Sequence, residues 1–161
     1  MLQDVFLFSG TVESNITLRS EEITSDIVKE ACRFVNADKV IDKLPNKYNE
    51  IVRERGKNFS SGERQLISFA RVVSHKPNIM ILDEATSSID TRTEQIVLKG
   101  MQNLMKGRTV FLIAHRLSTI QDAEAIMVLE HGRIIERGTH EQLIDLHGYY
   151  YQLYTGVFEL E

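Results

Sequence analysis

The stretch NFSSGERQLISFARVVSHKPNIMILDEATSSID, residues Asn58 to Asp90, decides the fold. It opens with two serines and a glycine, and it closes on an apolar run followed by two adjacent carboxylates. Between them, apolar residues recur at the spacing of one helical face, at Leu66, Phe69, Ala70 and Val73. A helix is therefore predicted over residues 62–75, ending before Pro77. The run at residues 79–82 is typical of a strand buried on both faces of a parallel sheet.

Further elements extend from this stretch in both directions. Residues 109–113 and 125–129 are two more continuous apolar runs, and a helical pattern over residues 91–105 separates the first of them from residues 79–82. A strand, a helix and a strand in this order predict the doubly wound α/β class. His131-Gly132 predicts a hairpin turn, a last helix is expected near His140, and residues 25–42 show an amphipathic helical pattern.

The length and composition indicate one globular domain of ordinary size, or one domain with a subdomain. The 161 residues are 42% hydrophobic, and their net charge of −4 comes without a block of like charge, so a nucleic-acid-binding tail is not expected. The single cysteine, Cys32, excludes an internal disulfide framework and is interpreted as a small core residue. The longest apolar runs are far shorter than the roughly 20 residues that span a bilayer.

Asp83 and Glu84 follow the strand predicted at residues 79–82 directly. Ligands bind at the carboxyl ends of strands in open α/β sheets, so this position indicates a functional site. Two adjacent carboxylates repel each other, and a divalent cation held through one of them leaves the other free to act as a base. The alternative is that one acid only caps the following turn.

Ser60, Ser61, Gly62 and Glu63 stand at the predicted start of the helix over residues 62–75. Backbone amides at a helix N-terminus bind anions, so a phosphate could dock there. Ser60 and Glu63 also fit a reciprocal capping box, which is an ordinary way to begin a helix. His115 follows the strand predicted at residues 109–113, which places it near the same crevice as Glu84. A lone histidine can equally be structural.

Taken together, these motifs closely resemble the nucleotide-binding domain of ATP-binding cassette (ABC) transporters, over nearly the whole chain. The residues that carry the resemblance are Gln3, the segment 59–65, the segment 79–84, the segment 87–90 and the segment 114–116. Residues 2–8 and 54–56 resemble the Q-loop and the loop before the signature of the exporter type. The resemblance implies an ABC ATPase core of the P-loop NTPase class, with a partial parallel sheet, flanking helices and an α-helical signature subdomain. Residues 1–76 would hold the Q-loop and the helical subdomain, and residues 77–161 the C-terminal half of the core.

The resemblance also implies a role for each matching residue, with ATP and Mg²⁺ bound in the complete domain. Asp83 would support Mg²⁺, Glu84 would be the general base, and His115 would contact the γ-phosphate. Gln3 would help hold the metal and the attacking water. Ser60, Ser61, Gly62 and Glu63 would grip a nucleotide held by the opposite subunit, and Asp90 would link the two sites. Ser61 departs from the usual glycine, and Glu63 stands where glutamine is common.

The Walker A pattern of glycine, four residues and Gly-Lys-Ser/Thr is missing. The Gly56-Lys57 pair has Ile51 at the first glycine position and Asn58 at the hydroxyl position. That loop supplies most of the binding of the β- and γ-phosphates, so this chain alone is expected to be inactive as an ATPase. It is interpreted as the C-terminal part of a longer polypeptide that contains the Walker A segment.

The implied partners are that Walker A segment, transmembrane domains, and a second nucleotide-binding domain in a head-to-tail dimer. The implied location is the cytoplasmic face of the cell membrane, as part of a multidrug-type exporter that couples ATP hydrolysis to transport. The chain itself is expected to be soluble.

Two alternatives differ in class. Chromosome-maintenance and DNA-repair ATPases share the signature serine, which is Ser60 here, and the Walker B pair, which is Asp83 and Glu84 here. The acidic balance and the lack of a coiled-coil heptad region speak against this alternative. A pseudo-ATPase interaction module is the second alternative. The presence of both Glu84 and His115 speaks against it.

Overall fold

The apolar stripe between Leu66 and Val73 forms helix α4 (Ser61–Ser74), which begins and ends one residue before the predicted bounds. In the computed structural model, which describes residues 5–83, 91–114 and 117–156, α4 is the central helix of the N-terminal part of the chain. It packs against α1 (Val12–Thr17), α2 (Ser25–Phe34) and α5 (Thr91–Met105). Because neighbours surround it, α4 buries polar residues such as Gln65 and Ser68 together with its apolar face.

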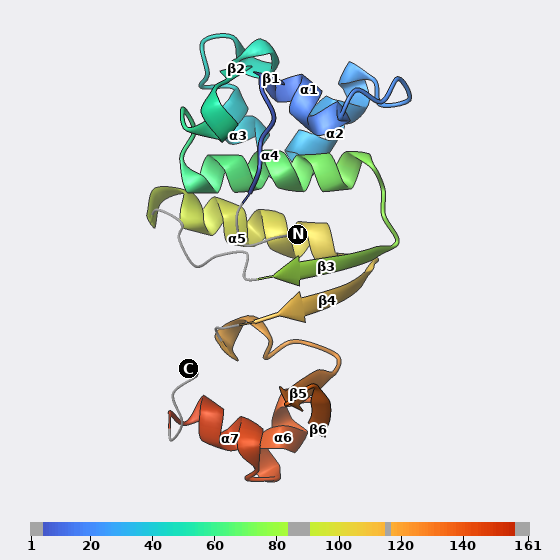
Figure 1. The fold of residues 1–161 in the computed structure, drawn as a ribbon, viewed down its shortest axis with the longest axis vertical. Coiled ribbons are helices and arrows are strands. Elements are labelled where there is room, and N and C mark those ends of the chain that lie inside the picture. The colour runs from blue at the N-terminus through green and yellow to red at the C-terminus, as the bar shows by residue number, and fades with distance from the viewer. Residues whose placement is uncertain (1–4, 84–90, 115–116, 157–161) are drawn as a thin grey trace. The chain divides into compact units, whose positions relative to one another are not determined.

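The chain forms two compact units, residues 1–111 and residues 112–161, with the boundary inside strand β4 (Figure 1). The first unit contains the elements β1 (Gly10–Thr11), α1, α2, α3 (Asp38–Ile41), η1 (Lys47–Asn49), β2 (Ile51–Val52), η2 (Glu54–Gly56), α4, β3 (Ile79–Asp83), α5 and the start of β4 (Thr109–Ile113). The second contains η3 (Leu117–Thr119), β5 (Ile126–Glu130), β6 (Arg133–Gly138), α6 (His140–Asp145) and α7 (Tyr149–Tyr154).

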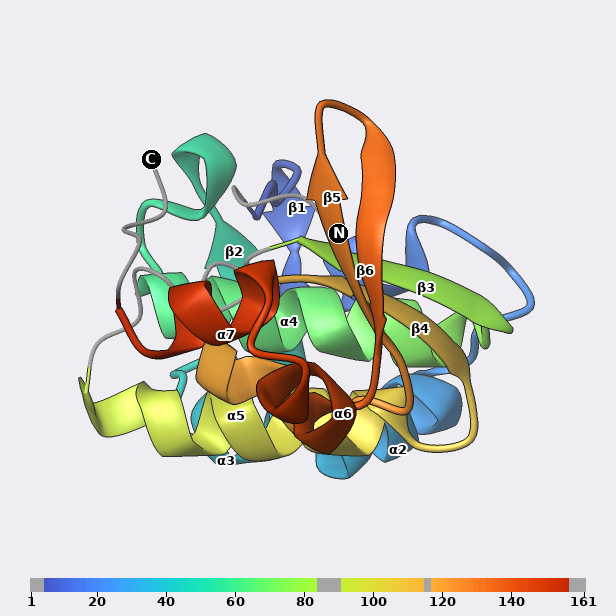
Figure 2. The same cartoon turned by 90° about the horizontal axis from the view of Figure 1, so that it is seen from below.

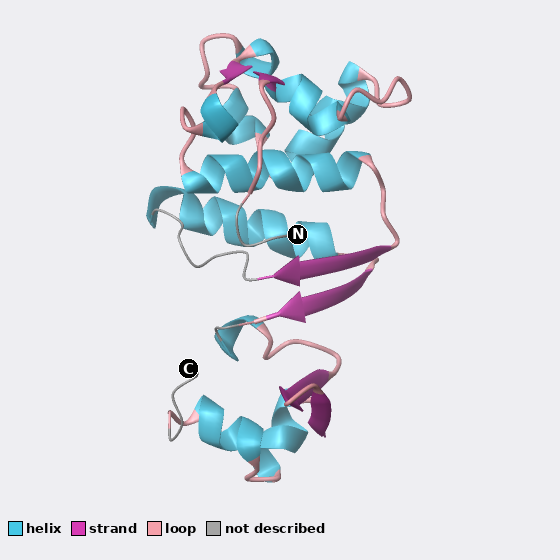
Figure 3. Ribbon diagram, in the orientation of Figure 1, coloured by secondary structure: helices cyan, strands magenta, loops and turns pink. Residues whose placement is uncertain are grey.

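Strands β3 and β4 are hydrogen-bonded neighbours, and their arrows point the same way in Figure 3. In the sequence these strands lie before and after α5, whose bounds match the prediction and whose Val97, Met101 and Leu104 are buried. The strand, helix, strand unit is therefore confirmed. In Figures 1 and 2 the chain runs along α4 in one direction and returns along β3 in the other, so the end of β3 lies on the side where α4 begins.

The expectation that these strands are buried on both faces is wrong for this chain. Met80 and Leu82 are 5% and 1% exposed, whereas Ile79 and Ile81 on the opposite face of β3 are 64% and 56% exposed. Phe111 and Ile113 of β4 are about half exposed in the same way. The helices of the first unit thus cover one face of this strand pair and leave the other uncovered.

The run at residues 125–129 also differs from expectation, because β5 pairs with β6 in an antiparallel sheet of its own. His131 and Gly132 connect the two strands as a two-residue turn with φ of 47° and 76°, the left-handed region that such tight hairpins require. The predicted hairpin is therefore confirmed. The core of the second unit is formed by Ile126, Leu143 and Tyr150. The expected last helix is divided into α6 and α7.

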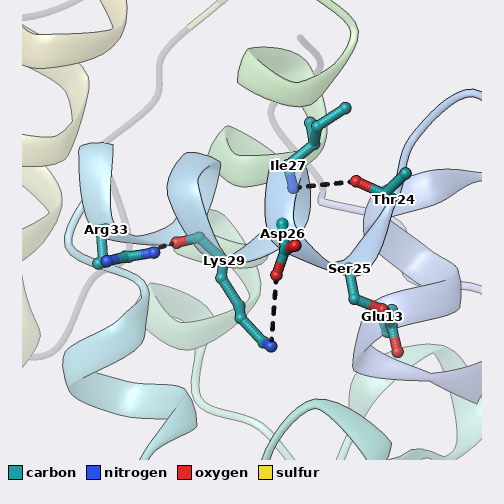
Figure 4. A network of polar contacts seen from close by, with 7 residues as sticks. All are labelled: Glu13, Thr24, Ser25, Asp26, Ile27, Lys29 and Arg33. Atoms are coloured by element: carbon teal, nitrogen blue, oxygen red, sulfur yellow. Dashed lines mark hydrogen bonds and ion pairs between the residues drawn. The ribbon is translucent and has the colours of Figure 1, made fainter.

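The helical pattern over residues 25–42 is likewise divided. Helix α2 stops at Phe34, Asn36 has a φ of 61°, and a short helix α3 follows. Thr24 caps α2 by accepting a hydrogen bond from the Ile27 amide, and Lys29 pairs with Asp26 at 3.7 Å (Figure 4). Cys32 is fully buried on α2, which confirms its interpretation as a core residue.

Across the described ranges, no helix combines the length and apolar character that crossing a bilayer requires.

Candidate functional site

Ser60 is the N-cap of α4, with an extended backbone that turns the chain into the helix. Its Oγ accepts a hydrogen bond from the Glu63 amide at 3.2 Å, and the Glu63 carboxylate accepts one from the Ser60 amide at 2.8 Å. Both bonds of the capping box are thus formed. Because both side chains hold backbone amides of the first turn, Ser60 and Glu63 fix the direction in which the helix N-terminus points.

The loop before Ser60 is held by the side chains of Arg64 and Asn58, which reach back to earlier residues of the loop. Arg64 of α4 donates to the carbonyl oxygens of Phe59 at 2.6 Å and Gly56 at 3.4 Å. Asn58 accepts from the Arg53 amide at 3.0 Å. Gly56 has a φ of 87°, and a Cβ there would lie 2.9 Å from Arg64 Cδ. Glycine is therefore required at this position both for the backbone conformation and for lack of space. The start of α4 is therefore preformed.

This N-terminus has the chemistry of an anion site with one opposing feature. Gly62 and Ser61 form its first turn, and a helix of 14 residues carries a partial positive charge at this end. Glu63 adds a carboxylate to the same turn, which weakens attraction for phosphate without preventing amide contacts. A glutamine would fill the same cap without the charge.

Asp83 is the last residue of β3 and is half-buried. Alternation along the strand places it on the same face as Ile79 and Ile81, opposite to Met80 and Leu82. An ionised carboxylate offers oxygen ligands only, which are the ligands that Mg²⁺ prefers, so Asp83 fits the metal by chemistry and by position at the strand end.

The structure therefore places the candidate residues that it describes on two elements, with Ser60 to Glu63 at the start of α4 and Asp83 at the end of β3. Gln3, Glu84, Asp90 and His115 lie outside the described residues. Within the described parts of the chain, no three His, Cys, Asp or Glu side chains are grouped so that they could hold a metal ion.

The structural roles of two arginines of α4 were not predicted from the sequence. Arg64 supports the loop before Ser60, and Arg71 donates to Phe6 O at 3.2 Å and Asn15 O at 2.7 Å. Burial lowers the pKa of the Arg71 guanidinium from its ordinary value. No sequence pattern distinguishes these arginines from solvent-facing ones, because their partners are backbone carbonyls. The only signal is that Arg71 stands beside the predicted apolar stripe.

Comparison with known proteins gives a consistent picture. The family model described as ABC transporter matches residues 1–87. The chain is 53% identical over 154 residues to the probable multidrug resistance ABC transporter ATP-binding/permease protein YheH of Bacillus subtilis, covering 96% of this chain and 23% of that protein. It is 46% identical over 153 residues to the fatty acid ABC transporter ATP-binding/permease protein of Mycobacterium bovis, covering 95% of this chain and 24% of that protein.

Among solved structures, a bacterial Atm1-family ABC exporter with ATP bound matches with a TM-score of 0.85 and 37% identity, over 99% of this chain and 28% of that one. The chain thus spans about a quarter of the length of the curated relatives that it matches. These matches do not favour the alternative of a chromosome-maintenance or DNA-repair ATPase.

Proposed function

The chain belongs to the ABC transporter family, and on this basis we propose that it forms part of an ATP-binding and ATP-hydrolysing domain that drives export across a membrane. The observation that carries the proposal is the position of Asp83, which closes β3 and is followed directly by Glu84. Carboxylates at the end of a core strand are suited to phosphoryl transfer to water, because one can hold the metal while the other accepts a proton.

In this proposal the residues have distinct roles. Asp83 would support Mg²⁺, which would neutralise charge on the phosphates. Glu84 accepts a proton from the attacking water as the water oxygen approaches phosphorus. His115 would contact the γ-phosphate, and Gln3 would help hold the metal and the attacking water.

The N-terminus of α4 serves a second nucleotide-binding domain. Amides of the first turn, with Ser60 and Gly62, contact the γ-phosphate of a nucleotide held mainly by the opposite subunit. Asp90 links the two sites. Partners are therefore a second such domain, arranged head to tail, and membrane-spanning domains, with the ATPase on the cytoplasmic face.

In this proposal the phosphate-binding Walker A loop, whose pattern does not occur in these 161 residues, is supplied by a separate segment. Its nested amides and lysine supply most of the phosphate affinity. The 161-residue chain alone therefore binds MgATP only weakly.

The test is a chimera in which this chain replaces the matching 154 residues of the Bacillus subtilis relative. We expect the purified chimera to hydrolyse ATP and Glu84→Gln to lower kcat by about a hundredfold or more. Glu22→Gln is the matched control, because Glu22 is an exposed carboxylate in the turn before α2. A folded chimera without ATPase activity, or one that Glu84→Gln leaves active, refutes the proposal.

A further inference from the structure

The segment Val5–Phe8 is attached at two places, to the loop that precedes α4 and to Arg71 of α4, although it belongs to no helix or strand. On one side Leu7 is fully buried, and it lies against the loop before the signature: a Cβ on Gly56 would be 3.1 Å from Leu7 Cδ1. On the other side Arg71 donates to the Phe6 carbonyl at 3.2 Å, and its guanidinium lies over the Phe8 ring at 5.8 Å. The segment is thus held by the loop that precedes α4 and by one arginine of α4.

Asn15 completes the attachment, and all four of its side-chain hydrogen-bonding positions are used. Its Oδ1 accepts from the Phe8 amide at 2.7 Å and from Arg71 Nη2 at 3.2 Å. Its Nδ2 donates to Phe8 O at 2.8 Å and Thr11 O at 3.0 Å. The side chain is 1% exposed, so a replacement that lacks one of these positions leaves a buried group unsatisfied.

Arg71 is a charged group held by oxygen dipoles. Within residues 5–83, 91–114 and 117–156, its guanidinium donates to the Phe6 and Asn15 carbonyls and to the Asn15 amide oxygen, and no carboxylate pairs with it. The planar guanidinium reaches two backbone carbonyls from different elements at once, which a lysine ammonium cannot do with the same geometry. A charge that needs these oxygens resists any movement that separates them.

We propose that Arg71 and Asn15 are positioning residues that lock the Val5–Phe8 segment onto helix α4. This inference rests on the proposed function, in which Gln3 precedes the segment and Ser60 begins the helix. Through the lock, the segment that follows the water-orienting Gln3 and the helix that contacts the opposite nucleotide move as one body. In this proposal Arg71 acts through the backbone that it holds, and not on the nucleotide or the metal.

Two variants separate this role from general stabilisation. Arg71→Lys keeps the positive charge and removes the planar guanidinium that donates to two backbone carbonyls. Arg108→Lys is the matched control, because Arg108 also donates to a backbone carbonyl, Leu104 O at 2.7 Å, and lies over an aromatic ring, that of Phe34. Both changes are made in the 161-residue chain and in the chimera.

The first measurement is amide hydrogen exchange in the 161-residue chain, followed by NMR. We expect Arg71→Lys to accelerate exchange of the Phe8 amide by about tenfold or more. The acceptor of this amide, Asn15 Oδ1, is then no longer held in a fixed orientation by the guanidinium. Arg108→Lys leaves that amide unchanged. An unchanged Phe8 amide in Arg71→Lys overturns the proposal, and so does equal acceleration throughout α1, α2 and α4, which would show general destabilisation.

The second measurement is steady-state ATPase kinetics of the chimera. We expect Arg71→Lys to lower kcat by about tenfold while KM for ATP changes less than about threefold, since the chemical step depends on the positioned segment and the affinity does not. Unchanged kcat, or a raised KM with unchanged kcat, overturns the proposal. An inactive parent chimera refutes the proposed function instead. The exchange experiment alone then tests whether Arg71 holds the Val5–Phe8 segment on α4.

Discussion

Gly100→Ala is expected to destabilise the chain, although alanine is the better helix former. Gly100 lies within α5 where this helix meets α2 and α4. A Cβ at this position would lie 2.5 Å from the backbone oxygen of Val35, 3.3 Å from Leu66 Cδ2 and 3.5 Å from Phe69 Cδ2. The backbone of Gly100 is not in the left-handed region, so the contact with Val35 O decides the outcome.

The magnitude follows from one stabilising and two destabilising contributions. Helix propensity favours alanine by about 1 kcal/mol. The overlap with a backbone carbonyl forces α5 away from α2, and overpacking of this kind costs about 1–3 kcal/mol. The shift also weakens the hydrogen bond from Asn103 to Phe34 O, 2.9 Å long, whose net contribution is about 1 kcal/mol. We expect a net loss of about 1–2 kcal/mol in the free energy of unfolding.

Urea denaturation followed by circular dichroism measures this loss. A decrease of that size shifts the midpoint down by about 0.5–1 M for a slope near 2 kcal/mol/M. Gln102→Ala is the control, because Gln102 is exposed on the same helix and its replacement leaves the midpoint unchanged or slightly higher. If Gly100→Ala raises the midpoint as the control does, the close approach of α5 to Val35 is refuted.

Three further predictions concern the signature, the buried thiol and the uncovered strand face. In the chimera, Glu63→Gln lowers KM for ATP about threefold to fivefold, because it removes about 1 kcal/mol of repulsion at the helix N-terminus and keeps the cap; an unchanged or raised KM contradicts this. Burial raises the pKa of Cys32 from 9.0 to about 12, so the free energy of unfolding falls as the pH rises from 9 toward 12. For the same reason, iodoacetamide at pH 8 labels the thiol only after unfolding. Rapid labelling of the folded chain would refute that assignment. The exposed Ile81 predicts self-association of the 161-residue chain, which Ile81→Glu reduces in light scattering; a monomeric parent chain would contradict it.

Local elements were predictable because their signals are local. The bounds of α5 and the turn at His131-Gly132 follow from periodicity and turn chemistry within a few residues. The break after α2 was not predictable, since the spacing of apolar residues does not indicate that Asn36 adopts a left-handed conformation. Burial of β3 on one face depends on which helices cover it, and that is a tertiary property.

The candidate site shows the same division. Motif spacing identified Ser60 and Glu63, and the structure adds that their side chains are engaged with the first turn of α4. The role of Arg71 was hidden because its partner Asn15 is 56 residues away and offers only carbonyl and amide oxygens. Such a contact leaves no charge pattern in the sequence. Geometry is required to find it.

The uncovered face of β3 and the missing phosphate loop point to the same requirement. The run Ile79 to Leu82 is apolar at every position, a pattern suited to burial on both faces, yet only Met80 and Leu82 are covered here. Asp83 shares the uncovered face with Ile79 and Ile81. In the proposed function, a segment that packs on this face would bury two isoleucines and would also adjoin the carboxylate that holds the metal. A single added segment can therefore complete both the core and the nucleotide site, so folding and ATP binding by this domain are expected to depend on the same contacts.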